Sequence, residues 1–410
     1  MSFKYIKVKT KGQIEGEKLL VPKLRFKEFN NQWRKIKLKD ISTDISYGMN
    51  SAATEYDGFN KYIRITDIDE ETSLYNNNPV SPSGNLDDKF LVKDNDILFA
   101  RTGASTGKAY LYNKTDGKLY FAGFLIRANI KKDYNSRFIF EQTKLGKYNN
   151  WVKIMSIRSG QPGINSIEYG NYEFSITHID EQKKIANVIE LVNKKIELQK
   201  QKIEALKIYK KGLLHKTFIN CCANCKIKDL LIMGKSGGTP KSTNTDYYDG
   251  NIPFLSISDM TSQGKYIKQT EKHISNLGLK NSSAWLLPVN TLILSMYASY
   301  GLLSINKISL STSQAMFNMI FKENINVEYI YYYLSYLKDR HFYEELVSTG
   351  TQANLNADKV KNMPIYLPNK TEQYKISNLF NILDNKLGLQ ESNLNNLIML
   401  KKSLLQQMFI

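Results

Sequence analysis

The sequence contains far fewer acidic than basic residues, and this deficit narrows the kinds of partner it can have. Its 39 Asp and Glu stand against 57 Lys and Arg, which gives a net charge of +18 and a pI near 9.4. Such an excess favours a polyanionic partner, with nucleic acid first and an anionic membrane surface second. Long hydrophobic runs are also missing, so we expect no membrane-spanning helix. The nearest candidate, residues 281–306, is interrupted by Pro288, Asn290 and Gly301, and we expect strand, turn and strand there.

Cysteine is scarce, and its three copies lie together in "CCANC" as Cys221, Cys222 and Cys225. The first residues of the sequence contain no apolar core of signal-peptide length. An odd, local cluster of cysteines in such a chain is no disulfide framework, and we expect a reducing compartment, the cytoplasm. The alternative is a zinc site completed by His215, but the spacing supplies no fourth ligand. We therefore expect free thiols in a linker.

Catalytic motifs are absent as well. "GASTGKA", residues 103–109, imitates a phosphate loop but has three residues between its glycines and Ala109 where a magnesium-binding hydroxyl belongs. "GKSGGTPKS", residues 234–242, is expected to lack both the preceding strand and the following helix of a nucleotide cradle. The four histidines show no HExxH spacing, and no Gly-rich AdoMet loop or "NPPY" segment follows a strand. We expect no catalytic residues, no metal and no cofactor in this chain.

The sequence does contain a long internal repeat. Residues 180–219, beginning DEQKKIANVI, align without a gap to residues 371–410, beginning TEQYKISNLF, with 15 identities in 40 positions. In each copy apolar residues recur in alternating steps of three and four, which is typical of a coiled-coil seam. These residues are Ile189, Val192, Ile196, Ile203, Leu206 and Leu213 in the first copy, and Phe380, Leu383, Leu387, Leu394, Leu397 and Leu404 in the second.

Both seams are interrupted at the same places, by Gln199 and Lys210 in the first copy and by Gln390 and Lys401 in the second. Matched polar seam residues can fix register, so they predict that two long helices pair with each other. If a pseudo-two-fold axis relates the copies, the pairing is antiparallel. The alternative is that each apolar stripe packs only on its own domain. About 38 residues at 1.5 Å rise give a rod of roughly 57 Å, longer than a small domain is wide, which favours pairing.

About 150 residues of a different composition precede each helix, with short apolar runs separated by turn signals. These segments repeat more faintly: "KLKDI" at Lys37 corresponds to "KIKDL" at Lys226, and "YIRITDI" at Tyr62 to "FLSISDM" at Phe254. We expect mixed α/β domains. The predicted organisation is an N-terminal segment 1–32, a first domain 33–177, a long helix 178–219, a linker 220–225, a second domain 226–368 and a second long helix 369–410.

Duplicated domains that open with a W-x-x-x-x-L-x-D-I pattern (Trp33, Leu38, Asp40, Ile41) and are closed by an EQ-x-x-I helix resemble the specificity subunit of type I restriction-modification systems. The resemblance covers about residues 21–410. The second domain departs from it, because no Trp opens that domain and the chain enters directly from the cysteine cluster through Lys226.

This resemblance implies a fold, a function and a set of partners. Each domain would be a target recognition domain that reads one half of a split sequence in double-stranded DNA. The paired helices would set the spacing of the halves and dock two methyltransferase subunits, and restriction and translocase subunits would join through the complex. The chain itself would be non-catalytic and would direct adenine methylation and restriction, with AdoMet, ATP and Mg held by the partner subunits.

Candidate DNA contacts lie on eight turns at corresponding places in the two domains. Phosphates require Lys, Arg and backbone N–H donors, while base edges require Arg, Asn and Gln, aided by Ser and Thr. In the first domain the candidates are Tyr47, Asn50, Ser51, Arg64, Thr66, Arg101, Thr102, Ser105, Lys108, Arg158, Ser159 and Gln161. In the second they are Lys235, Ser236, Thr239, Lys241, Ser256, Ser258, Tyr297, Ser299, Thr349, Gln352 and Asn354.

Two other functional classes compete with this interpretation. A non-enzymatic coiled-coil protein could direct its positive charge at another acidic partner, and salt-sensitive, sequence-dependent binding of duplex DNA would separate the two. An enzyme would need its own AdoMet, ATP or metal site, for which the sequence offers no motif. The bases that are read do not follow from the sequence, because they depend on loop geometry and on DNA shape.

Overall fold

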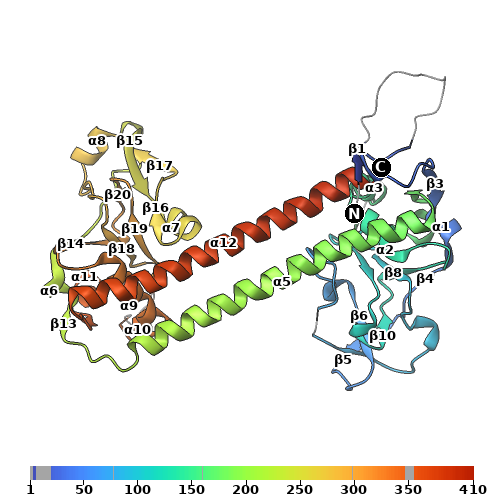
Figure 1. The fold of residues 1–410 in the computed structure, drawn as a ribbon, viewed down its shortest axis with the longest axis horizontal. Helices are drawn as coiled ribbons and strands as arrows, with labels where there is room; N and C mark the ends of the chain where they lie inside the picture. The colour runs from blue at the N-terminus through green and yellow to red at the C-terminus, as the bar shows by residue number, and fades with distance from the viewer. Residues whose placement is uncertain (1–2, 6–19, 77, 159, 298, 347–354) are drawn as a thin grey trace. The chain divides into compact units, whose positions relative to one another are not determined.

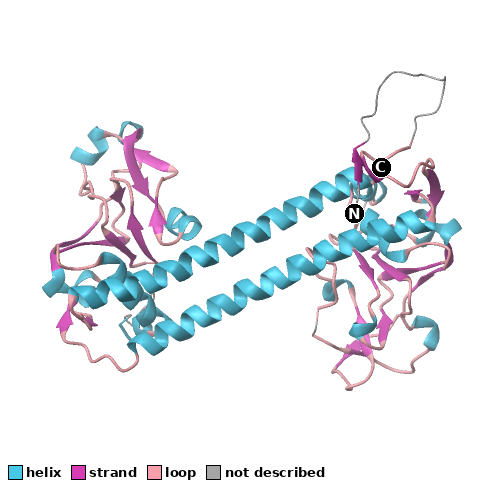
Figure 2. Ribbon diagram, viewed as in Figure 1, coloured by secondary structure: helices cyan, strands magenta, loops and turns pink. Residues whose placement is uncertain are grey.

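The computed structural model describes residues 3–5, 20–76, 78–158, 160–297, 299–346 and 355–410 (Figures 1 and 2). The chain divides into two compact units. Unit 1 contains residues 1–199 and 393–410, and unit 2 contains residues 200–392. Each unit therefore combines one domain with part of each long helix, α5 (Ile179–Phe218) and α12 (Lys370–Met408).

Unit 1 is built on a four-stranded antiparallel sheet in the order β4–β11–β8–β9. The strands are β4 (Ser42–Tyr47), β11 (Leu125–Ile130), β8 (Asp96–Ala100) and β9 (Ala109–Leu111). Every residue of β8, the apolar run "DILFA", is buried. Short pairs surround this sheet: β6 (Lys61–Ile63) with β10 (Leu119–Phe121), β3 (Arg34–Lys37) with β12 (Glu173–Ile176), β5 (Ala53–Thr54) with β7 (Ser81–Pro82), and β1 (Phe3–Tyr5) with β2 (Leu24–Phe26).

The helices of unit 1 cover this sheet and close its core. They are α1 (Leu38–Ile41), α2 (Ser136–Gln142), α3 (Gly146–Met155) and α4 (Ser166–Asn171), with short 3₁₀ turns η1 (Ile65–Asp67), η2 (Asp88–Phe90) and η3 (Lys114–Asp116). Ile185 and Ile189 from the start of α5 lie in the same buried cluster as Leu405, Met408 and Phe409 from the end of the chain. The core of the first domain is thus completed by residues from both long helices.

Unit 2 repeats this plan with a five-stranded sheet in the order β14–β21–β18–β19–β16. Its strands are β14 (Leu231–Ser236), β21 (Met316–Phe321), β18 (Leu292–Ser295), β19 (Leu303–Asn306) and β16 (Tyr266–Ile267). Two smaller sheets flank it, β17 (Lys272–Ile274)–β15 (Tyr248–Leu255)–β20 (Ser311–Thr312) and β13 (Cys225–Lys226)–β22 (Pro364–Ile365). The helices are α6 (Ile227–Leu230), α7 (Ile257–Gln263), α8 (Asn276–Lys280), α9 (Val327–Asp339), α10 (Phe342–Leu346) and α11 (Ala357–Lys361), with a 3₁₀ turn η4 (Thr245–Tyr247).

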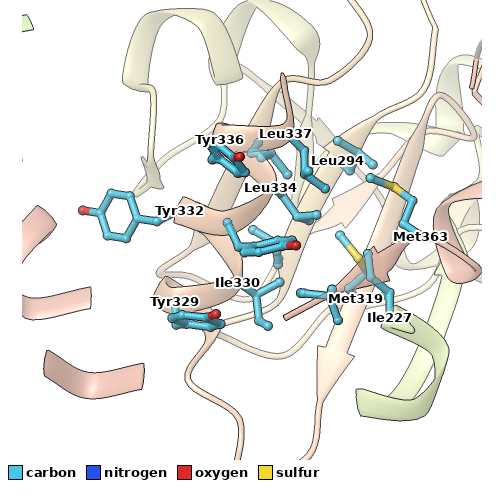
Figure 3. Close-up of a cluster of buried hydrophobic side chains, with 14 of the residues drawn as sticks. Ile227, Leu294, Met319, Tyr329, Ile330, Tyr332, Leu334, Tyr336, Leu337 and Met363 are labelled. Atoms are coloured by element: carbon cyan, nitrogen blue, oxygen red, sulfur yellow. The ribbon is translucent and has the colours of Figure 1, made fainter. Parts of the chain in front are cut away.

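The main core of unit 2 forms under α9, an unusually Tyr-rich helix. Ile330 and Leu334 point from α9 toward the sheet that contains Met319 of β21, and Tyr329 belongs to the same buried cluster (Figure 3). Tyr332 projects from another side of α9, and its hydroxyl donates to Asp384 of α12 at 2.6 Å (Figure 3). Because a long aromatic side chain removes both apolar surface and a hydroxyl from water, each buried Tyr needs an acceptor of this kind.

The structure agrees with most of the local sequence predictions. β18 and β19 pair antiparallel, as the strand, turn and strand expected in residues 281–306 require. One expectation was wrong: "GKSGGTPKS" is preceded by a strand, since β14 ends at Ser236. β14 escaped detection because "LIMGKS" alternates poorly and pairs on one side only, with β21. The next element is the three-residue turn η4, so the loop still has no α-helix to complete a nucleotide cradle.

The two long helices run antiparallel within each unit, as predicted. In unit 1, the first turns of α5 share a buried cluster with the last turns of α12. In unit 2 the other ends of the two helices meet, because Lys210 near the end of α5 forms an ion pair with Asp384 near the start of α12. The helices span residues 179–218 and 370–408, within one or two residues of the predicted bounds 178–219 and 369–410. Seam residues such as Ile189, Ile203 and Phe380 are buried, as an apolar seam requires.

The repeated Glu-Gln pair at the start of each helix has a structural role. The side-chain oxygen of Gln182 accepts the backbone N–H of Asn135 at 2.9 Å, and that of Gln373 accepts the backbone N–H of Asn326 at 2.9 Å. These two asparagines cap α2 and α9 through their own side chains. Each glutamine also donates to a carbonyl just before its own helix. One buried side chain therefore joins the long helix to the domain in both units.

Candidate nucleic-acid interface

The predicted loops of the first domain converge at one end of its sheet. Tyr47 lies at the end of β4, and its hydroxyl accepts the backbone N–H of Ser166 at 3.1 Å. Arg101 follows β8, and its carbonyl accepts the backbone N–H of Ile164 at 2.9 Å. Since strand ends are rigid, these bonds hold loops from three distant parts of the sequence in fixed relative positions.

A cavity of about 660 Å³ opens where these loops meet. Six of the candidate contact residues line it, namely Tyr47, Asn50, Ser51, Arg64, Thr66 and Arg101. Phe124, which the sequence analysis did not single out, completes the wall and is 63% exposed. Its signal in the sequence was an aromatic residue beside Gly123 in the turn between two strands. The sequence therefore predicted six of the fourteen lining residues, but not the most exposed aromatic side chain among them.

Two arginines in this cavity are held in defined orientations. Asp67 accepts the Nε and Nη2 of Arg64 at 2.8 Å each, and Asp67 itself is 6% exposed. The hydrogen bonds to Asp67 hold the pKa of Arg64 above its ordinary value. The guanidinium of Arg101 lies 4.8 Å from the centre of the Tyr47 ring. Because the fork of an arginine can donate two parallel hydrogen bonds, fixing its plane decides which acceptors it can meet.

The loop after β4 requires glycine because the backbone comes very close there. A Cβ on Gly48 would lie 2.2 Å from the carbonyl oxygen of Ala122. The same closeness recurs in unit 2, where a Cβ on Gly237 would lie 2.2 Å from the carbonyl oxygen of Thr312. Both glycines immediately follow the matching strands β4 and β14. The duplicated turn is therefore set by the backbone, and the residues around it are free to differ.

The remaining candidates of the first domain lie outside this cavity. Ser105 and Lys108 line a neighbouring hollow of about 670 Å³, where the Lys108 ammonium donates to the carbonyl of Ile68 at 2.9 Å. Thr102 forms a backbone bridge with Gly163. Arg158 is drawn to Glu168 at 2.6 and 2.7 Å, so it fastens its own loop. Gln161 is exposed, and Ser159 lies outside the described residues.

In the second domain the candidates lie on the equivalent loops. Lys235, Thr239, Lys241, Ser258, Tyr297 and Ser299 are exposed. Trp285 donates its indole N–H to the carbonyl of Ser236 at 3.0 Å. Ser256 caps α7 through Asp259, in the position that Arg64 has before η1. Thr349, Gln352 and Asn354 lie outside the described residues.

Strand pairing identifies which residues of unit 2 correspond to the cavity lining of unit 1. The backbone N–H of Arg101 donates to Phe124, and the N–H of Met296 donates to Ala315. Tyr47 pairs with β11, as Ser236 pairs with β21. The lining residues Tyr47, Arg64, Arg101 and Phe124 therefore correspond to Ser236, Ser256, Met296 and Ala315. Two cations and two aromatic rings in the first domain are replaced by hydroxyls and small or apolar side chains in the second.

The cysteine cluster forms no site of its own. The thiols of Cys221, Cys222 and Cys225 are free, and burial raises the pKa of Cys221 and Cys225. In the part of the chain that the structure describes, no group of three His, Cys, Asp or Glu side chains is arranged to hold a metal ion. Within the same residues, no helix is both long and apolar enough to cross a bilayer.

The chain contains two copies of one α/β domain, and residues from both long helices complete the core of each copy. Polar loops at the strand ends of both copies are typical of a protein with two binding domains. The profile described as the type I restriction modification DNA specificity domain matches the chain twice, over residues 30–207 and 223–399. The chain belongs to this family, which confirms the resemblance drawn from its sequence.

Similar proteins agree with this assignment. The type I restriction enzyme MjaIX specificity subunit of Methanocaldococcus jannaschii is 28% identical over 160 residues, 39% of this chain and 37% of that protein. The HindI specificity subunit of Haemophilus influenzae is 29% identical over 135 residues, 33% of this chain and 29% of that protein. These matches span roughly a third of each relative's length.

Solved structures match over much more of the chain and support the fold. The S subunit of a type I restriction-modification system from M. genitalium covers 95% of this chain and 99% of its own, with a TM-score of 0.58 and 17% identity. A chain from a study of complex assembly in the type I R-M system covers 92% and 97%, with a TM-score of 0.61 and 14% identity.

Proposed function

We propose that this chain is the sequence-specific DNA-recognition subunit of a type I restriction-modification complex, and that each domain reads one half of a bipartite target. The observation that carries this proposal is the cavity of unit 1, where residues from distant loops meet, together with the chemical difference at equivalent positions of unit 2. A duplicated scaffold with unlike linings suits two unlike half-sites. The net charge of +18 supplies the attraction to phosphates that any such complex needs.

The first domain carries the groups best suited to reading guanine. Arginine donates a bidentate pair of hydrogen bonds to the O6 and N7 of guanine in the major groove. Arg64 and Arg101 are oriented by Asp67 and Tyr47, so little freedom is lost on binding. Ser256 and Met296, the counterparts of Arg64 and Arg101 in the second domain, discriminate bases less strongly. We therefore expect the first half-site to contain at least one guanine that depends on Arg101.

The long helices present docking surfaces for the catalytic partners. Exposed apolar residues recur at equivalent positions of both helices, away from the seam, and each is 47 to 69% exposed. They are Leu191, Leu198, Ile208 and Tyr209 on α5, and Ile382, Leu389, Met399 and Leu400 on α12. Exposed apolar side chains that recur along a helix are typical of a protein contact. Two equivalent surfaces fit two methyltransferase subunits per chain.

The catalytic chemistry belongs to these partners in this proposal. AdoMet, ATP and Mg would be held by the methyltransferase and by the restriction and translocase subunits, and this chain would select the site. Leu198→Lys and Leu389→Lys are matched variants, each altering one docking surface. Each should reduce the methyltransferase content at saturation from two subunits to one, measured by native mass spectrometry. A wild-type complex that holds only one such subunit would contradict the pairing of surfaces with partners.

The decisive experiment is methylation mapping of the host genome with and without this gene. The proposal expects adenine methylation at one split sequence that disappears with the gene. Arg101→Gln should weaken binding by about 1–3 kcal/mol and relax the sequence at one position of one half-site. If the chain instead serves another acidic partner as a coiled-coil protein, the methylation pattern stays unchanged and duplex binding shows no dependence on sequence.

A further inference from the structure

The cavity of unit 1 is large enough to hold a small ligand. Side chains that read a groove protrude into it, whereas this site is a hollow of about 660 Å³, within the roughly 300–1,000 Å³ range of sites that enclose a small ligand. Its floor is rigid. Tyr62 is 2% exposed, and its hydroxyl donates to the carbonyls of Met49 at 2.8 Å and Ser51 at 3.1 Å.

The walls of the hollow suit one planar, polar ring. Tyr47 offers an aromatic face that is held at its tip by the Ser166 amide and covered on one side by Arg101. Arg64 offers donors in a plane fixed by Asp67. Asn50, Ser51 and Thr66 line the same space with further hydrogen-bonding groups. Aromatic faces combined with convergent donors and acceptors are what recognises a nucleobase outside a helix.

Phe124 stands at the rim of this hollow in a position suited to a wedge. Its ring is 63% exposed, yet its backbone is anchored, because its carbonyl accepts the N–H of Arg101 at 3.0 Å. Arg101 in turn lines the hollow. An apolar ring on a fixed turn can enter a base step and occupy the place of a base that has left the stack.

We propose that this hollow receives one nucleobase turned out of the target duplex, with Phe124 filling the gap that the base leaves. The inference rests on the proposed function, since it takes duplex DNA as the ligand and adds a specific site for one of its bases. Unit 2 offers Ser236, Ser256, Met296 and Ala315 at the equivalent positions, so the extruded base belongs to the half-site of the first domain.

Fluorescent base analogues test this directly in the assembled complex. The target found by methylation mapping is prepared with 2-aminopurine in place of each adenine, and pyrrolocytosine in place of each cytosine, one position at a time. Unstacking raises the emission of both analogues, and a methyltransferase itself extrudes the adenine that it methylates. We therefore expect a several-fold rise at one position of the first half-site other than the methylated adenine. Phe124→Ala should abolish that rise. Phe59→Ala is the matched control, because Phe59 is 79% exposed in the same unit and does not line the hollow.

Mismatched duplexes give a second readout that does not depend on an analogue. A mismatch at the responding position removes the pairing that extrusion must break, so it should tighten binding by tenfold or more. Elsewhere in the half-site a mismatch should weaken binding. If sequence-specific binding persists with no fluorescence rise and no tightening at any position other than the methylated adenine, the base in the hollow is disproved and the recognition role stands. If sequence-specific binding is absent, the proposed function itself fails.

Free nucleosides distinguish the other source of the same ring. In equilibrium dialysis of the full chain without DNA, adenosine, guanosine, thymidine and cytidine should show no binding at micromolar concentrations, because the base is delivered by the duplex. Micromolar binding of any of them that Phe124→Ala leaves in place would identify a free nucleoside site and overturn the proposal.

Discussion

Asn193→Asp should destabilise unit 1, and adding Glu141→Gln should restore it. Glu141 is 2% exposed, accepts the side-chain amide of Asn193 at 3.4 Å and lies near Lys401. Burial raises the pKa of Glu141, and Lys401 counteracts this. A second carboxyl at position 193 would force one of the two to keep its proton at pH 7. Holding a carboxyl protonated about three pH units above its ordinary pKa costs roughly 4 kcal/mol at most, and Lys401 offsets part of it.

Unit 2 shows that the same place works with the carboxyl on the other residue. There Lys210, the counterpart of Lys401, pairs with Asp384, the counterpart of Asn193. The position of Glu141 is taken by Tyr332, whose hydroxyl donates to Asp384 at 2.6 Å. Each seam lysine thus has one carboxylate, supplied by the domain in unit 1 and by the long helix in unit 2. Moving the acid within unit 1 should therefore be tolerated, whereas duplicating it should not.

We expect Asn193→Asp to cost about 2–4 kcal/mol and the double variant to lie within about 1 kcal/mol of wild type, a coupling of at least about 1 kcal/mol. Urea unfolding followed by tryptophan fluorescence measures this by unit. Trp33 and Trp151 lie in unit 1 and Trp285 in unit 2, so a Trp285→Phe background reports unit 1 alone. Additive single and double variants would refute the view that positions 141 and 193 are alternative places for one carboxylate.

Three further predictions concern the core, the pH response and the helices. Phe409→Ala, which removes a ring 5.1 Å from Phe138 and 6.3 Å from Trp33, should destabilise unit 1 by about 3–5 kcal/mol and leave the Trp285 transition in place, as urea unfolding would show. Burial lowers the pKa of Lys144 to about 8, so above that pH the folded state binds fewer protons than the unfolded chain. Unit 1 should therefore gain stability from pH 8 to 10, and Lys144→Met should flatten this rise in thermal melts. Adding one helical turn, about 5.4 Å, to both α5 and α12 should lengthen the gap between the half-sites by one or two base pairs and leave the half-sites unchanged. Methylation mapping would show both results. Altered half-sites would mean that the helices take part in base reading.

The sequence predicted the features that follow from periodicity and repetition. The long helices, their antiparallel pairing and the loops that gather at the end of the first sheet all follow from patterns within the chain. Arg64, Arg101 and Tyr47 were found because their residue types suit base or phosphate contacts and because their loops follow apolar strands. Such signals are local, so a single sequence suffices to find them.

The remaining features depend on which distant residues meet, and the sequence pattern does not contain that information. The ion pair of Arg158 with Glu168 at 2.6 Å and the hydrogen bond of the Lys108 ammonium to a backbone carbonyl are two such features, and both residues stay candidate contacts. Phe124 is of a residue type usually found in the core, yet its side chain is exposed on a turn whose carbonyl accepts the N–H of Arg101. Glu141 in unit 1 and Asp384 in unit 2 lie at different positions of the repeat, yet each lies near the seam lysine of its own unit. Neither repeat alone indicates this relation, because it appears only when the lysine neighbours are known.

The residues that recur in both domains differ in their role from those that do not, and this difference has a physical reason. Gln182 and Gln373, the asparagine caps they hold, and Gly48 and Gly237 recur because each satisfies a backbone constraint that both domains share. A side chain that fastens backbone has few substitutes, so it is preserved when the lining changes. The lining of the strand-end loops carries no such constraint, and it differs at each of the four positions that strand pairing equates. A chain built in this way can change what one domain binds without loosening either domain, which is the property that a reader of two independent half-sites requires.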